Sequence, residues 1–206
     1  MKEKIRKVIL VISVCVFVFS AFQLGKIFYD YYMIEKETND IVDTYVEEPQ
    51  DDKDPLHRVI HFKELQKNNS DVIGWLYIPD TKIDEPILKG KDNDSYLYTD
   101  IYKKSNKAGA IFIDKINEKD FKDDNTIIYG HNMKNGSMFA QLKKFTQDEE
   151  TYKKSKYFWI FTPEKNYRYE IISAYTTGVN SDTYTLFKGP GEEFEKYLEK
   201  IRGYSE

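Results

Sequence analysis

The residues best placed to do chemistry lie in the stretch Asn125–Phe139, where a short apolar run ends in Gly130 and His131. A histidine fixed at the end of a strand, close to backbone amides, can act as a general acid or base or as the charge partner of a nucleophile. The same position also suits a histidine that only caps a strand and hydrogen-bonds to its rim, and the residues alone leave both readings open. The usual partner of such a histidine is a cysteine, and the chain has one, Cys15.

Neither Cys15 nor a nearby serine is expected to be the nucleophile. Cys15 lies between Val14 and Val16 in an apolar N-terminal segment, where a thiol surrounded by lipid is hard to ionise. Ser137 follows His131 by six residues, but no G-x-S-x-G elbow surrounds it. The sequence therefore indicates a chemistry without showing its nucleophile.

A metal site is not expected either. His57 and His61 are four residues apart and Glu64 follows three residues later, which on one helix would bring three potential ligands to one face. The spacing is not H-E-x-x-H, and a solvated helix face beside an acidic segment explains it more simply. We expect no metal and no cofactor.

The N-terminal segment predicts a membrane anchor. Residues 8–25 carry no charge, and they follow Lys2, Lys4, Arg6 and Lys7 and precede Lys26. This pattern is typical of one transmembrane helix with residues 1–7 in the cytoplasm and the remainder exported. A cleaved signal peptide is the alternative, although no clear cleavage site follows the apolar run.

The exported part is acidic and free of cysteine. Residues 31–206 keep 26 of the 31 basic and 33 of the 35 acidic side chains, a net charge of −7, so nucleic acid is not an expected partner. No disulfide can stabilise this part, because the single cysteine lies in the anchor. Residues 26–55, with a loosely helical pattern over 29–46 and an acidic break at 47–54, are expected to be a stalk and linker.

Beyond the linker the pattern predicts a mostly β domain with flanking helices. Asp54 and Pro55 are typical of a helix start, and we expect one helix there with Leu56, Val59, Ile60 and Leu65 on its apolar face. Two further helices are expected over 137–145 and 191–203. Six short β-branched or aromatic runs predict strands in a barrel or sandwich, at 73–79, 86–89, 110–114, 126–129, 157–162 and 168–177.

Several motifs, taken together in order, carry a family resemblance. They are Phe62–Leu65, Asn69–Ile83, the Glu-Pro-Ile at 85–87, Lys91–Leu97 and Ile127–Met133. This arrangement resembles a class B sortase over residues 56–203. The domain organisation expected from it is 1–7 cytoplasmic, 8–25 transmembrane, 26–55 stalk or linker and 56–206 sortase-like catalytic domain.

The resemblance implies a cysteine transpeptidase on the outer face of a Gram-positive cell membrane. Such enzymes cut a C-terminal sorting signal of a secreted protein, hold the protein as a thioester and pass it to an amine of the peptidoglycan cell wall. His131 matches the catalytic histidine of the family. Asn93, Leu97 and Tyr129 match positions that line the sorting-signal groove.

The chain departs from the family pattern at its C-terminal end. The family continues with a strand that ends in a Thr-Leu-x-Thr-Cys-like motif and a further strand that bears an arginine, whereas this sequence stops at Glu206 and Arg202 does not match that arginine. We therefore expect an incomplete sortase-like barrel that lacks its last two strands and is inactive by itself. Two alternatives stay open: a non-catalytic surface module that binds sorting signals or a partner, and a membrane-anchored β-domain without peptide specificity.

Overall fold

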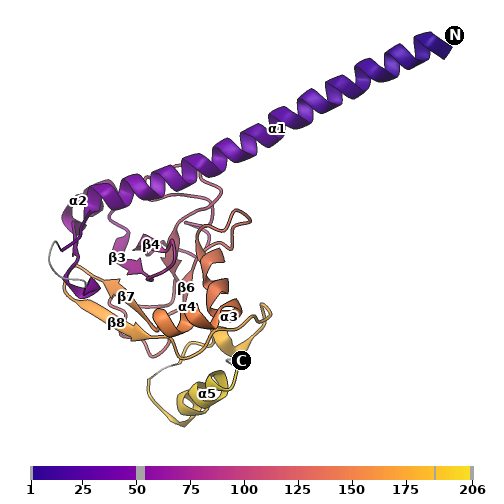
Figure 1. Cartoon of the computed structure of the whole chain (residues 1–206). Helices are drawn as coiled ribbons and strands as arrows, with labels where there is room; N and C mark the ends of the chain where they lie inside the picture. Colours follow the sequence, from indigo (N-terminus) through magenta and orange to yellow (C-terminus); the bar gives the residue numbers. More distant parts are fainter. Residues whose placement is uncertain (1, 50–53, 188, 205–206) are drawn as a thin grey trace. The chain divides into compact units, whose positions relative to one another are not determined.

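The computed structural model describes residues 2–49, 54–187 and 189–204. The chain divides into two compact units, Met1–Asn39 and Asp40–Glu206. The first is part of one helix, and the second holds the sheet and the remaining helices (Figure 1).

Helix α1 (Lys2–Tyr45) contains the apolar N-terminal segment. By length and composition it is a candidate membrane span, with a mean hydropathy of 2.5 over its most apolar window. The segment 26–55 that we expected to be a stalk and linker is helical as far as Tyr45, and Val46–Glu47 forms strand β1. The middle of the predicted acidic break, residues 50–53, lies outside the described residues.

The prediction of a single helix after Asp54 is wrong. Asp54 does cap a helix start, since its side chain accepts a hydrogen bond from Leu56 N at 3.0 Å. That helix is only one 3₁₀ turn, η1 (Pro55–His57), and it is followed by strand β2 (Val59–Ile60) and helix α2 (Phe62–Asn68). β2 pairs antiparallel with β1, so the apolar residues that suggested one helical face serve three different elements.

The buried Arg58 explains why the chain turns between η1 and β2. Its guanidinium donates to Asp84 Oδ2 at 2.6 Å and to Oδ1 at 3.2 Å, pairs with Glu48 at 2.7 Å and lies 4.1 Å from the centre of the Tyr77 ring. Burial alone would lower the pKa of Arg58, but the bonds and charges of Asp84 and Glu48 outweigh it and raise that pKa. This ion pair ties the N-terminal connection to the sheet.

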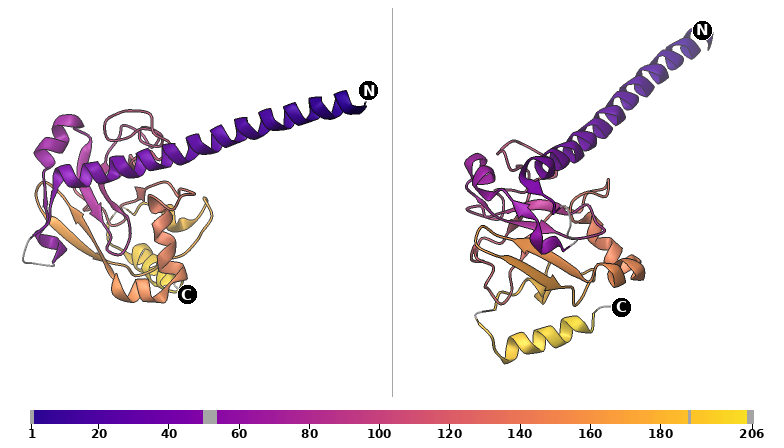
Figure 2. Two further views of the ribbon diagram at one scale, coloured as in Figure 1. Left: turned by 45° about the horizontal axis from the view of Figure 1, so that its top comes forward. Right: turned by 60° about the vertical axis from the view of Figure 1, so that its left-hand side comes forward.

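Six strands form one curled, half-barrel sheet (Figures 1 and 2). Among the described residues their order is β6-β5-β4-β3-β7-β8, and every neighbouring pair is antiparallel except β4 and β5, which are parallel. The bounds are β3 (Val72–Tyr77), β4 (Asp84–Leu88), β5 (Ile111–Ile113), β6 (Ile128–Tyr129), β7 (Tyr157–Phe161) and β8 (Asn166–Glu170). All six predicted strands are present, and the mostly β class is confirmed.

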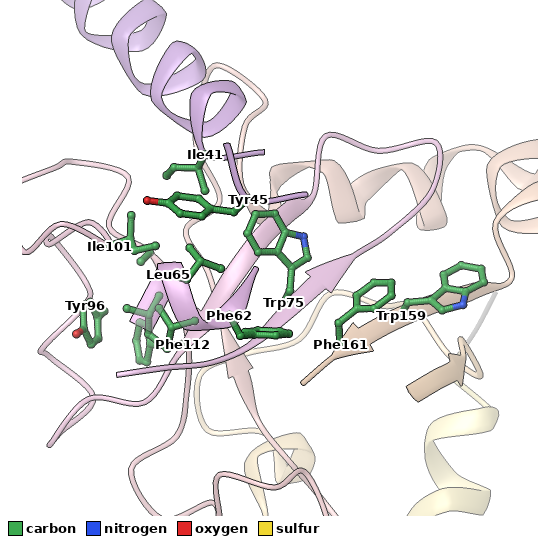
Figure 3. Close-up of a cluster of buried hydrophobic side chains, with 13 residues drawn as sticks. Ile41, Tyr45, Phe62, Leu65, Trp75, Tyr96, Ile101, Phe112, Trp159 and Phe161 are labelled. Atoms are coloured by element: carbon green, nitrogen blue, oxygen red, sulfur yellow. The ribbon is translucent and has the colours of Figure 1, made fainter. Parts of the chain in front are cut away.

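One face of the sheet holds a large apolar cluster (Figure 3). It joins the last turn of α1 and helix α2 to side chains of the central strands. Leu65, Val72, Trp75 and Leu88 in this cluster are fully buried. The opposite face is lined by Leu76, Ile87, Ile111 and others, so the central strands are apolar on both faces.

The helices after β6 differ from the expectation in detail. The helix predicted over 137–145 begins later and consists of η2 (Phe139–Lys143) and α3 (Lys144–Gln147). Helix α4 (Glu149–Lys154) and the short η3 (Asp182–Tyr184) were not predicted. The last predicted helix is confirmed as α5 (Glu192–Arg202), which stands apart from the sheet in the right-hand view of Figure 2.

Candidate functional site

His131 lies two residues after the end of β6 and is half-buried. Its Nε2 is 2.7 Å from the carbonyl oxygen of Leu97. Because a carbonyl oxygen only accepts hydrogen bonds, Nε2 carries the proton, and Nδ1 is the ring nitrogen left to take or give one. The exposed Tyr98 ring lies beside the imidazole, with 5.4 Å between ring centres and 37° between ring planes.

The chain around His131 is held by a tight return of the backbone. The carbonyl of His131 accepts from Phe139 N at 3.0 Å, and Asn132 forms a bridge with Met138. The Phe139 ring lies so close to Gly130 that a Cβ there would be 2.8 Å from a ring carbon. Gly130 is therefore required for this approach, which fixes the backbone immediately before His131.

A second cluster of polar groups lies around Asp114, at the end of β5. Asp114 Oδ2 accepts from the Tyr129 hydroxyl at 2.9 Å and from Asn93 Nδ2 at 2.8 Å, and Asp114 Oδ1 accepts from Ile116 N at 2.9 Å. Asn93 Oδ1 in turn accepts from Lys115 N at 2.8 Å. Burial and the bond to Asp114 raise the pKa of Tyr129 to about 12.

The Lys89 ammonium binds the turn that follows β5, next to this cluster. Its Nζ donates to the carbonyl oxygens of Asp114 at 2.9 Å and Lys115 at 2.7 Å and also to that of Asn117. Burial is the main reason why the pKa of Lys89 is lowered, although Asp114 opposes it. The ammonium thus satisfies several carbonyls of one turn that follows β5.

The histidines that suggested metal ligands do not share a helical face. His57 is the last residue of η1, and His61 precedes α2 and pairs with Glu47 at 2.9 Å. Across residues 2–49, 54–187 and 189–204, no group of three or more His, Cys, Asp or Glu side chains is arranged to hold a metal ion.

Comparisons with known proteins agree on one family. A family described as "Sortase domain" matches residues 76–194, more than half of the chain. The chain belongs to the sortase family. The relatives place it in class B, because it is 44% identical over 145 residues to sortase B of Listeria monocytogenes and 29% identical over 179 residues to sortase B of Staphylococcus aureus.

Solved sortase B structures share its fold. Sortase B of Bacillus anthracis in complex with AAEK1 superposes with a TM-score of 0.71 at 35% identity, covering 86% of this chain and 82% of that one. Sortase B of Listeria monocytogenes gives 0.63 at 42% identity, covering 70% of this chain and 82% of that one. The sequence matches cover 69% of this chain and 58% of the Listeria protein, and 79% of this chain and 72% of the Staphylococcus protein.

The sortase fold brings the predicted site residues into two linked pairs. His131 contacts the Leu97 carbonyl, while Asn93 and Tyr129 meet on the carboxylate of Asp114. The pairs are joined through the chain, since Leu97 follows Asn93 by four residues and His131 follows Tyr129 by two. Cys15 lies in the other compact unit, on α1.

Sequence reasoning missed Asp114, Lys89 and Tyr98. Asp114 directly follows an apolar strand, a position where an acidic residue is usually taken as the start of a turn. Lys89 is the last residue of the predicted strand 86–89. For Asp114 and Lys89, the signal that could have found them was the end of a buried strand beside each, where polar side chains of neighbouring strands meet. No such signal marks Tyr98, which lies in the connection between β4 and β5.

Proposed function

We propose that this chain carries the membrane anchor and the histidine-bearing part of a class B sortase. The enzyme would cleave a C-terminal sorting signal and join the protein to an amine of the cell-wall peptidoglycan. The observation that carries the proposal is the geometry of His131, whose Nε2 is held by Leu97 so that Nδ1 is the nitrogen available for proton transfer. Family membership supplies the reaction class.

The proposed chemistry needs a thiol beside His131. A cysteine thiolate would attack the scissile carbonyl, the imidazolium would protonate the leaving amine, and the resulting thioester would be resolved by the acceptor amine. Tyr129, Asn93 and Leu97 would line the groove that holds the sorting signal. The acceptor amine would return its proton to the imidazole as the new amide forms.

The unit that carries His131, Asp40–Glu206, contains no cysteine. Cys15 belongs to an apolar stretch of α1, in the other compact unit. We therefore propose that the 206 residues do not turn over a sorting signal by themselves. Activity would require a thiol from outside this unit.

The experiment compares two proteins made in membranes. One is the 206-residue chain, and the other is the chain extended by whatever the genomic DNA encodes after Glu206. Each is incubated with a library of internally quenched pentapeptides, with and without hydroxylamine to intercept a thioester. We expect cleavage by the extended protein alone, enhanced by hydroxylamine and abolished by His131→Ala. Cleavage by the 206-residue chain, or unchanged turnover in His131→Ala, would contradict the proposal.

A second function is favoured by the same absence of cysteine from this unit. A sortase-like module could bind sorting signals or a partner without cleaving them. Saturable peptide binding by the extended protein with no cleavage would select this alternative. We also propose that α1 crosses the membrane once with its N-terminus in the cytoplasm, which protease protection of an N-terminal epitope in sealed vesicles would test.

A further inference from the structure

One buried carboxylate connects two separate segments of the site. Asp114 is 7% exposed, and its Oδ2 accepts from both the Tyr129 hydroxyl and Asn93 Nδ2. Its other oxygen is occupied by Ile116 N. The Asp114 carboxylate therefore accepts three hydrogen bonds, and these bonds hold the three donors in place.

The charge state of Asp114 fixes the direction of these bonds. Burial alone would raise its pKa, but the bonds from Ile116 N, Asn93 and Tyr129, together with the charge of Lys89, lower that pKa below the ordinary value. At neutral pH the carboxylate is ionised and can only accept. Tyr129 and Asn93 must therefore be the hydrogen-bond donors to it.

We propose that Asp114 is the positioning residue of this site, which sets the hydrogen-bonding polarity that Asn93 and Tyr129 present to a bound peptide. The Tyr129 proton is committed to Asp114, so Tyr129 offers only oxygen lone pairs. Asn93 Oδ1 accepts from Lys115 N, and one N–H of Asn93 Nδ2 donates to Asp114. The second N–H of Nδ2 is left as a donor. One donor beside one acceptor is complementary to the C=O and N–H of a peptide backbone.

The same carboxylate joins the two segments that hold the imidazole. Asn93 leads into Leu97, whose carbonyl binds His131 Nε2, and Tyr129 leads into His131 itself. Loss of the Asp114 bonds would let these segments separate and would weaken the bond that fixes the imidazole proton on Nε2. The identification of the ligand as a peptide rests on the proposed function, whereas the positioning of Tyr129 and His131 does not.

The first test is spectroscopic and uses the full chain in detergent micelles. With ¹³C-labelled tyrosine, the Tyr129 phenol, assigned with Tyr129→Phe, should titrate with a pKa of about 12. In Asp114→Asn this pKa should fall, because the contribution of the carboxylate disappears while that of burial stays. Asp71→Asn is the matched control, since Asp71 accepts from the Tyr96 hydroxyl at 2.6 Å, and burial and this bond raise the pKa of Tyr96 to about 12 as well. Each variant should move only its own tyrosine.

The second test reads the imidazole of His131. A long-range ¹H–¹⁵N correlation should show the Nε2–H tautomer in the unaltered chain and a mixture of tautomers in Asp114→Asn. If Asp114→Asn does not fold, Tyr129→Phe and Asn93→Ala each remove one of the two bonds and should each shift the imidazole resonances. An unchanged Tyr129 titration and an unchanged imidazole in folded Asp114→Asn, or unchanged resonances in both single-bond variants, would overturn the proposal.

The third test concerns the peptide and uses the extended protein of the proposed function. Asp114→Asn should lower kcat/KM for peptide cleavage by about 10²-fold, as expected for a misplacement of about 1 Å, and Asp114→Glu should not restore it. An unchanged kcat/KM would refute the assigned polarity. If the extended protein cleaves no peptide at all, the proposed function fails, while the two spectroscopic tests still decide whether Asp114 positions the site.

Discussion

Replacement of Glu85 by glutamine should change how the stability of the sortase domain depends on pH. Glu85 lies on the central strand β4, opposite Leu76 of β3 and on the same face as Ile87. Both neighbours are buried. Burial, and to a lesser extent the charge of Asp84, raise the pKa of Glu85 from 4.5 to about 7.

The sign follows from proton binding. Between pH 4.5 and about 7 the folded chain keeps a proton on Glu85 that the unfolded chain has lost, so the free energy of unfolding decreases as the pH rises through this window. Each pKa unit corresponds to about 1.36 kcal/mol, which gives a loss of about 3 kcal/mol at pH values above both pKa values. This is an upper value, because the side chain is partly exposed and solvent screens its charge.

The assay is urea unfolding of the full chain in detergent micelles, followed by tryptophan fluorescence. The chain has two tryptophans, Trp75 and Trp159, and both report on the sheet. Glu85→Gln, a neutral isostere of the protonated acid, should match the unaltered chain near pH 4.5 and be more stable than it by up to about 3 kcal/mol above the folded pKa.

Asp182 serves as the control, because its contribution to stability changes with pH in the opposite direction. Lys200 holds the pKa of Asp182 below its ordinary value of 3.8, so the stability that Asp182 contributes is present above pH 3.8 and is lost as the pH falls through its folded pKa. Asp182→Asn should therefore show a constant offset across the window in which Glu85→Gln diverges. Parallel curves for Glu85→Gln and the unaltered chain would refute the reasoning.

Three further substitutions test the packing around the site and the sheet. Gly130→Ala places a Cβ against the Phe139 ring and should cost about 1–3 kcal/mol in urea unfolding; full native stability would contradict the close approach. Arg58→Ala removes the buried guanidinium that pairs with the half-buried Asp84 carboxylate and should cost about 3–5 kcal/mol, whereas Lys196→Ala at an exposed helix pair should cost far less, and equal effects would disprove the difference. Lys89→Met removes the ammonium that holds three carbonyls and should speed limited proteolysis after β5; an unchanged cleavage pattern would show that this turn does not depend on it.

The sequence predicted the strands well because each is a short apolar or aromatic run between turn residues. The end of the last strand was placed too late, at 177, although β8 stops at Glu170. The reason lies in the pairing with β7, which begins only at Tyr157. The last hydrogen bond between β7 and β8 runs from Ile171 N to Lys156 O at 2.8 Å. A strand ends where its partner ends, which no local pattern records.

The helix expected at Leu56–Leu65 shows the opposite error. Four apolar residues fitted one helical face, but so short a pattern also fits a turn, a two-residue strand and a separate helix. The ion pair between Arg58 and Asp84, 26 residues apart, decides between these alternatives. Helical spacing cannot reveal such a long-range contact.

His131 was found from the sequence because a Gly-His pair after a short strand is a local signal. Asp114 was not, because its two side-chain partners are 21 and 15 residues away along the chain. The positions of Asn93, Leu97 and Tyr129 came from the family resemblance, and their roles in binding stay predictions. The structure adds how they are connected.

The parallel pairing of β4 and β5 has a consequence for how this fold can diversify. Parallel neighbours need a crossover, and here residues 89–110 provide it and carry Asn93 and Leu97. This connection contributes no strand to the sheet. It folds back on itself, with Ala110 N bonded to Tyr96 O at 3.0 Å, and a Cβ at Gly109 would lie 2.4 Å from the carbonyl oxygens of Tyr96 and Leu97. Mutations in the crossover can therefore alter the surface around Asn93 and Leu97 while the ladders of the sheet stay intact, so this surface and the sheet can evolve at separate rates within one small domain.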